Sequence, residues 1–271
     1  MERTVHYRLF ECLMRFAAGS LLLGGLLMIA GCRSSSVQSE EQQAQDRMAS
    51  LRADFKQVLD QGVNRYHFDD WVGGLSLRAV INRRNEVVSC TAEALPDYPL
   101  QRFPDNRKLA PLLEEICWNM VFPRVGPQLF SNDPGENLQV VIPMVFSPPR
   151  SRPMEEQRVR ATVREYRDQE RYLWRQLFVG ERLDSIGIAR FHGVVSEQGQ
   201  IARCQVEWVA IDERLPDFKP DSGLVQRLEA RCATLDLQQM SVFLTSLPVG
   251  QRFLFELEYT PWKTWSKHSF Q

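Results

Sequence analysis

The most reactive side chains in this chain are its six cysteines, and their spacing restricts the chemistry open to them. A thiol can ligate a metal, form a disulfide or accept a covalent group. No two cysteines have Cys-x-x-Cys spacing, and His67 and His192 lack ligand-like spacing, so the sequence predicts no metal site. Disulfides and covalent modification remain, with buried free thiols as the alternative. The six positions are Cys12, Cys32, Cys90, Cys117, Cys204 and Cys232.

The first 31 residues have the pattern of a secretory signal. Arginines at positions 3, 8 and 15 precede an apolar run at residues 16–30, and Ile-Ala-Gly-Cys occupies residues 29–32. A membrane-spanning helix needs about 20 apolar residues, more than this run supplies. The pattern favours a signal peptide at residues 1–31 over a transmembrane anchor, and it predicts a protein that works outside the cytoplasm.

Cys32 stands directly after small residues, an arrangement that resembles the lipobox of bacterial lipoproteins. The resemblance implies that Cys32 is lipidated and becomes the first mature residue. It also implies a periplasm-facing anchor in the outer membrane, because Arg33 replaces the aspartate that retains such proteins in the inner membrane. Residues 32–43 are polar, with several serines, and are expected to form a flexible tether.

The four cysteines outside the signal and the lipobox are expected to form two disulfides, since an oxidising compartment favours them. Four cysteines allow three pairings.

The chain contains an internal repeat. Segments ending at Cys90 and Cys204 share an apolar–polar–apolar pattern, with Asn85 and Gly199 as turn residues at the same distance before the cysteine. Leu-Pro-Asp sequences at residues 95–97 and 215–217 follow in each copy. A helix is expected next in each copy, with one apolar face formed by Leu109, Leu113 and Cys117 in the first and by Leu224, Leu228 and Cys232 in the second. Each copy then ends in a strand of alternating apolar residues, at 140–146 and 253–259. Helices over residues 40–59 and 154–178 are expected to open the two copies.

This order of elements resembles the C-terminal domain of the TonB energy-transducer family. The resemblance rests on the hairpin at residues 194–201, on Val-Phe-Pro at residues 121–123, and on the last strands at residues 139–146 and 253–259. It implies an α+β fold of two tandem modules, each helix–strand–strand–helix–strand. It also implies the pairs Cys90–Cys117 and Cys204–Cys232. The expected organisation is a signal at 1–31, a tether at 32–43, modules at 44–148 and 154–262, and a tail at 263–271.

Composition and motifs argue against two classes of function. The net charge of −1 at pH 7 gives no basic excess for nucleic acid. No Gly-x-Ser-x-Gly, His-Glu-x-x-His or P-loop sequence occurs, so neither an enzyme nor a cofactor is predicted. The paired acids Asp69–Asp70 and Glu114–Glu115 are expected to be solvated rather than to act as acid–base pairs, and His192 is expected on a strand surface.

The expected function is binding or scaffolding in the cell envelope, by adding a strand of a protein partner to an exposed last strand. Pro143 interrupts the last strand of the first copy, whereas that of the second copy has no proline. The candidate partner-binding residues are therefore Leu254, Glu256, Glu258, Trp262 and Trp265. For the two tryptophans, a role in capping the core of the second copy is the alternative. A TonB-like energy transducer with an uncleaved N-terminal anchor, or an enzyme of unknown type, are the alternative functions.

Overall fold

The computed structural model describes residues 40–66, 70–130, 135–147, 154–196, 201–240, 250 and 252–264. The chain divides into two compact units, Met1–Gln38 and Ser39–Gln271, and every described element belongs to the second. The expected signal peptide, the lipidation site Cys32 and most of the tether lie outside the described residues, as does Trp265.

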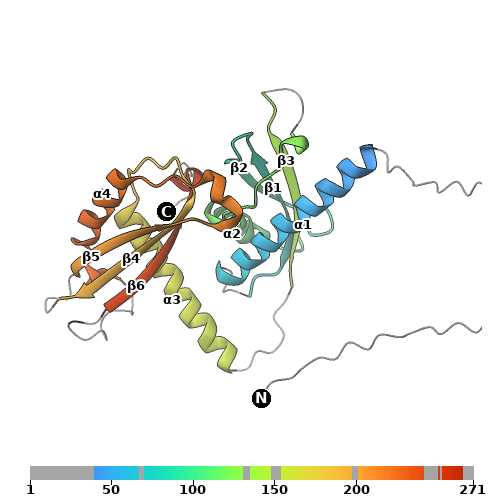
Figure 1. Cartoon of the computed structure of the whole chain (residues 1–271). Helices are drawn as coiled ribbons and strands as arrows, with labels where there is room; N and C mark the ends of the chain where they lie inside the picture. Colours follow the sequence, from blue (N-terminus) through green and yellow to red (C-terminus); the bar gives the residue numbers. More distant parts are fainter. Residues whose placement is uncertain are drawn as a thin grey trace, which may run out of the picture. The chain divides into compact units, whose positions relative to one another are not determined.

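The first repeat forms a three-stranded antiparallel sheet in the order β2-β1-β3, and Figure 1 shows it with its helices. Its opening helix is longer than the periodicity predicted. The elements are α1 (Glu40–Tyr66), β1 (Gly73–Ile81), β2 (Val87–Ala94), α2 (Asn106–Asn119), the 3-10 helix η1 (Pro127–Leu129) and β3 (Leu138–Phe146).

The second repeat has the same topology, with the sheet order β5-β4-β6. Both hairpins even shift register at equivalent places, between Val80 and Ile81 and between Val194 and Val195. The fold is therefore mixed α+β with two small antiparallel sheets, compatible with two tandem modules. Its elements are α3 (Met154–Leu177), β4 (Gly187–Val195), β5 (Ile201–Val209), η2 (Asp212–Asp217), α4 (Ser222–Cys232), η3 (Leu237–Gln239), β6 (Arg252–Tyr259) and η4 (Trp262–Thr264).

The turn between β1 and β2 depends on Asn85. Its φ of 60° lies in the left-handed region, which asparagine tolerates better than most residues. Its side chain is buried, accepts a hydrogen bond from the backbone N–H of Val125 and donates one to the carbonyl oxygen of the same residue. The predicted turn role is thus confirmed, while Gly199 lies outside the described residues.

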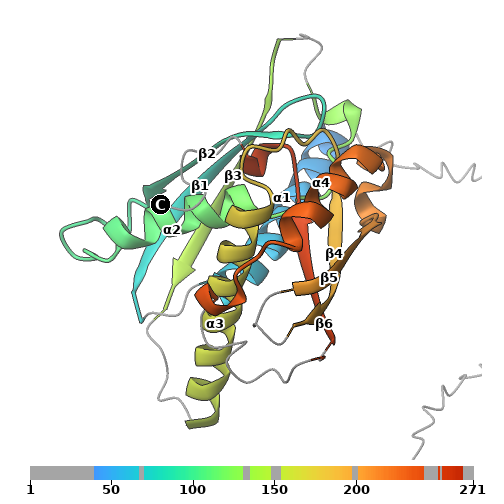
Figure 2. The same cartoon turned by 90° about the vertical axis from the view of Figure 1, so that its left-hand side faces the viewer.

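Each repeat ties its second strand to the following helix by a disulfide. Leu109, Leu113 and Cys117 form one fully buried face of α2, which Figure 2 shows alongside β1 and β2. Cys117 is joined to Cys90, and Cys232 of α4 is joined to Cys204 of β5. This is the pairing within repeats that the resemblance implied.

The two hydrophobic cores are separate clusters, but the C-terminal segment of the second repeat enters the first. Trp262 is 0% exposed and belongs to the cluster built by α1, α2 and the first sheet. The predictions that it contacts a partner or caps the second core are wrong, because η4 lies against α2 and the indole ring is buried in the first cluster. Lys263, expected in a tail, is also buried.

Arg214 joins the two repeats through a buried hydrogen-bond network. Its side chain is 1% exposed, and the guanidinium donates to the carbonyl oxygens of Phe122 (2.6 Å) and Asn85 (2.9 Å) in the first repeat. The carboxylate of Asp217 accepts a third bond at 2.8 Å. Burial lowers the pKa of Arg214 from its ordinary value, and Asp217 opposes that shift. The repeats are therefore parts of one packed unit, with polar as well as apolar contacts between them.

The expectation that Glu115 is solvated is wrong, because a helix of the second repeat also packs against this residue of the first. Helix α3 brings Arg167 and Arg171 against it, with a distance of 3.5 Å from the Arg167 guanidinium to the carboxylate and a close ion pair with Arg171.

Candidate functional site

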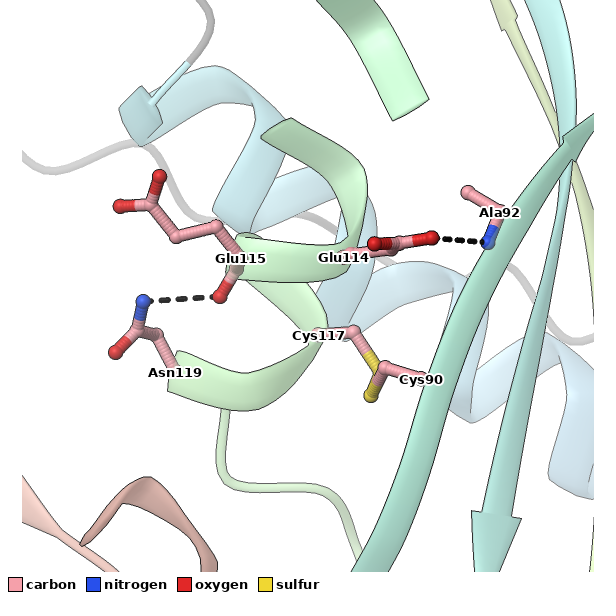
Figure 3. The surroundings of a disulfide bond; sticks show 6 residues. All are labelled: Cys90, Ala92, Glu114, Glu115, Cys117 and Asn119. Atoms are coloured by element: carbon pink, nitrogen blue, oxygen red, sulfur yellow. Dashed lines mark hydrogen bonds between the residues drawn. A yellow bond between two sulfur atoms is a disulfide. The ribbon is translucent and has the colours of Figure 1, made fainter. Parts of the chain in front are cut away.

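Four strands lie at sheet edges in the described part of the chain: β2, β3, β5 and β6. At the first of them, β2, a glutamate side chain binds an outward backbone N–H, and we call such an edge closed. Figure 3 shows Glu114 of α2 reaching β2, where its Oε1 accepts a hydrogen bond from the backbone N–H of Ala92 at 2.9 Å. The disulfide between Cys90 and Cys117 holds the same helix on the same strand. Glu114 is therefore not merely solvated, as expected, but occupies an outward donor of an edge strand.

The edge of β5 is closed in the same way. Glu229 of α4 accepts a hydrogen bond from the backbone N–H of Val206 at 3.1 Å, and the Cys204–Cys232 disulfide again joins helix to strand. The repeat has thus kept a carboxylate and a disulfide at the equivalent edge in both copies.

Proline blocks the edge of β3. Gly74 in β1 accepts a hydrogen bond from Leu95 on the β2 side, so Ser76, two residues on, also directs its peptide groups to β2. Pro143 lies opposite Ser76, and its own peptide groups therefore face away from β1, toward the edge. Since proline has no N–H, this edge lacks a donor near its middle.

The edge of β6 has neither device. Val206 gives its N–H to Glu229 rather than to β4, so Phe191 opposite it directs its peptide groups toward β6. Phe191 also lies opposite Phe255, and the flanking residues of β6 therefore direct their N–H and C=O groups away from β4. These outward positions are Leu254, Glu256 and Glu258, and no described strand pairs with β6 on its outer side.

A polar network occupies the Glu258 end of this edge. The ammonium group of Lys263 lies 3.4 Å from the carbonyl oxygen of Glu258 and 3.5 Å from the carboxylate of Glu170. Glu170 also accepts a hydrogen bond from the hydroxyl of Tyr66, whose pKa is raised by burial and by the Glu170 charge. Among the described residues, the outward backbone groups of β6 without a hydrogen-bond partner are therefore those of Leu254 and Glu256, together with the N–H of Glu258.

The side chains of β6 alternate between the two faces of the sheet, as predicted. Leu257 and Tyr259 are buried, and Phe255 stacks on Phe191 with 4.8 Å between ring centroids. On the other face Leu254 is 55% exposed, and Glu256 pairs with Arg190 at 2.6 Å. The exposed face thus combines apolar and charged groups beside the open backbone.

A groove of about 630 Å³ runs along this edge. Residues 254–258 of β6 form one wall, and the apolar Val163, Tyr166 and Leu173 of α3 contribute to the other. A volume of this size falls in the range of ligand-binding clefts, and five residues of strand span about 17 Å. The groove can therefore accept an extended segment lying against β6.

The described residues offer little for other chemistry. They contain no cluster of three potential metal ligands, and none of their helices is long and apolar enough to cross a membrane. His192 is half-exposed on β4, with its Nε2 3.6 Å from the carboxylate of Glu207, as expected for a residue on a strand surface.

Comparison with known proteins adds no identification. No family model matches the chain, and neither a curated protein nor a solved structure matches it.

Proposed function

We propose that this protein is a cell-envelope binding protein that captures an extended segment of a partner protein by adding it as a strand to β6. The proposal rests on one observation. Of the four described sheet edges, β2 and β5 each have one outward N–H bound by a glutamate and β3 lacks one at Pro143, whereas β6 keeps the outward N–H groups of residues 254, 256 and 258 beside a groove. Main-chain hydrogen bonds would supply affinity, and side-chain contacts along the groove would supply specificity.

The location we propose follows from the N-terminal sequence. Cys32 is the lipidated first residue, anchored in the outer membrane and facing the periplasm, and the modules are of the TonB C-terminal type. The described disulfides support an oxidising compartment. The partner is accordingly a protein of the periplasm or outer membrane, and the proposal includes no catalytic step and no cofactor.

Glu256→Pro tests the edge. The N–H of Glu256 points away from β4, so proline at this position removes a donor from the edge without breaking a hydrogen bond of the sheet. Pro143 occupies the equivalent position in β3. We expect the yield of partner crosslinked in native envelopes to fall at least about tenfold, because the added strand loses a bond and meets the proline ring.

Two controls separate backbone from side chain. Glu256→Gln breaks the ion pair with Arg190 but keeps the N–H, and it should retain capture. Pro143→Ser, on the other edge, should leave the yield unchanged. Equal capture by wild type and by a Glu256→Pro variant with an unchanged circular dichroism spectrum would exclude β6 as the binding edge.

A further inference from the structure

The sequence of β6 is complementary to itself. We propose that, when no partner is bound, β6 pairs antiparallel with β6 of a second copy of this chain, so that self-association closes the binding edge. This inference rests on the proposed function, because both occupants use the same edge.

One antiparallel register matches the side chains. With Leu254 on the two-fold axis, Arg252 lies opposite Glu256 of the second copy, and Phe253 lies opposite its Phe255. Two-fold symmetry repeats each of these contacts, so the interface contains two charge pairs, two aromatic pairs and one leucine pair. Opposite charges and aromatic pairs are the cross-strand neighbours that stabilise antiparallel sheets.

The backbone fits the same register. Leu254 and Glu256 direct their N–H and C=O groups to the open edge, and the alternation along β6 extends this to Arg252, opposite Val194. Each of the three positions then forms a hydrogen-bonded pair that exchanges two bonds. The phenylalanines fall at the intervening positions, where side chains of paired strands approach most closely.

Two other registers bring like charges together. Centring the pair on Glu256 would place that carboxylate opposite its copy and Leu254 opposite Glu258. Centring it on Arg252 would place two guanidinium groups together. Like charges directly opposite each other destabilise a strand pair, so these two registers are disfavoured. Centring the pair on Phe255 would place Leu254 opposite Glu256 and Arg252 opposite Glu258, whose carbonyl oxygen already lies 3.4 Å from the ammonium group of Lys263. The register centred on Leu254 keeps opposite charges together without using that occupied carbonyl.

The apolar surface exposed beside the edge is consistent with an occupant that brings apolar side chains of its own. Leu254 is 55% exposed, and Tyr166, on the opposite wall of the groove, is 58% exposed. A second copy of β6 covers Leu254 with the same residue and lies along the wall that carries Tyr166.

The consequence for function is competition. A partner segment must displace the second copy, so its apparent affinity falls as the local concentration of the chain rises. Anchoring to a membrane surface raises that local concentration and favours the self-associated state.

Cysteine crosslinking of the full chain in native membranes tests the pairing. Leu254→Cys places two thiols together on the two-fold axis, so mild oxidation should give a disulfide-linked dimer on a non-reducing gel. Val141→Cys, at the equivalent exposed position of β3, is the matched control and should give none. In the Leu254→Cys background, Arg252→Glu should lower the dimer yield at least about tenfold. Glu256→Arg, made together with Arg190→Glu so that the ion pair within the chain is kept, should do the same, and the three changes together should restore the yield.

The result that overturns the pairing is absence of the dimer from Leu254→Cys, or a dimer yield that the charge changes leave unaltered. A combined charge reversal that fails to restore the yield also overturns the register. Neither result touches the proposed function, which is measured by the capture of a different protein and its loss in Glu256→Pro. Conversely, a restored dimer together with partner capture that Glu256→Pro leaves intact would keep the pairing and reject strand addition.

Discussion

Replacing Trp262 with alanine is expected to lower the free energy of unfolding by about 3–5 kcal/mol, the usual loss when a buried tryptophan is truncated. The side chain is fully buried in the core of the first repeat although it follows the last strand of the second. The guanidinium of Arg214, which itself bridges the repeats, lies 5.5 Å from the centre of its ring. Removing the ring therefore leaves a cavity where the repeats meet. Urea unfolding followed by circular dichroism measures the loss.

Trp262→Phe is the matched control. The indole Nε1–H has no hydrogen-bond partner among the described residues, so phenylalanine removes an unsatisfied donor and keeps much of the apolar volume. We expect a loss well below that of alanine. If Trp262→Ala lowered stability by less than about 1 kcal/mol, the packing of this residue between the repeats would be wrong.

Removing the first disulfide by replacing Cys90 and Cys117 with alanine should cost about 3.5 kcal/mol. The cysteines are 27 residues apart, and the chain-entropy relation gives this value for a loop of that length. The bond also holds α2, and with it Glu114, against the edge of β2. Urea unfolding under non-reducing conditions measures this loss in the free energy of unfolding.

The second disulfide offers an internal comparison. Cys204 and Cys232 are 28 residues apart, so their removal should destabilise the protein by nearly the same amount. If one pair could be removed without measurable loss while the other could not, the two repeats would not use their disulfides equivalently.

The alternating and helical patterns of the sequence were sufficient to predict most elements. Leu109, Leu113 and Cys117 define one face of α2, and the alternation of residues 253–259 defines β6, because buried positions must recur at the period of the element. Pro143 also indicates an edge strand from the sequence alone, since proline cannot donate within a sheet.

The contacts between elements were not predictable in this way. Helical periodicity assigned Glu114 to the solvent, whereas its carboxylate accepts a hydrogen bond from the backbone N–H of Ala92 at the edge of the sheet. One signal was present in the sequence, because Glu114 and Glu229 occupy equivalent places in the repeat, each three residues before a disulfide cysteine. Trp262 and Arg214 carried no such signal, since their partners lie in the other repeat.

Photo-crosslinking from single positions tests the central claim, that β6 is the edge that captures a partner. A photoreactive amino acid at position 254, in the full chain in its native envelope, should give an adduct containing another envelope protein, linked through one extended segment. The same amino acid at position 141, the equivalent exposed position of β3, should not give that adduct. Partner adducts from position 141, and none from position 254, would contradict the account.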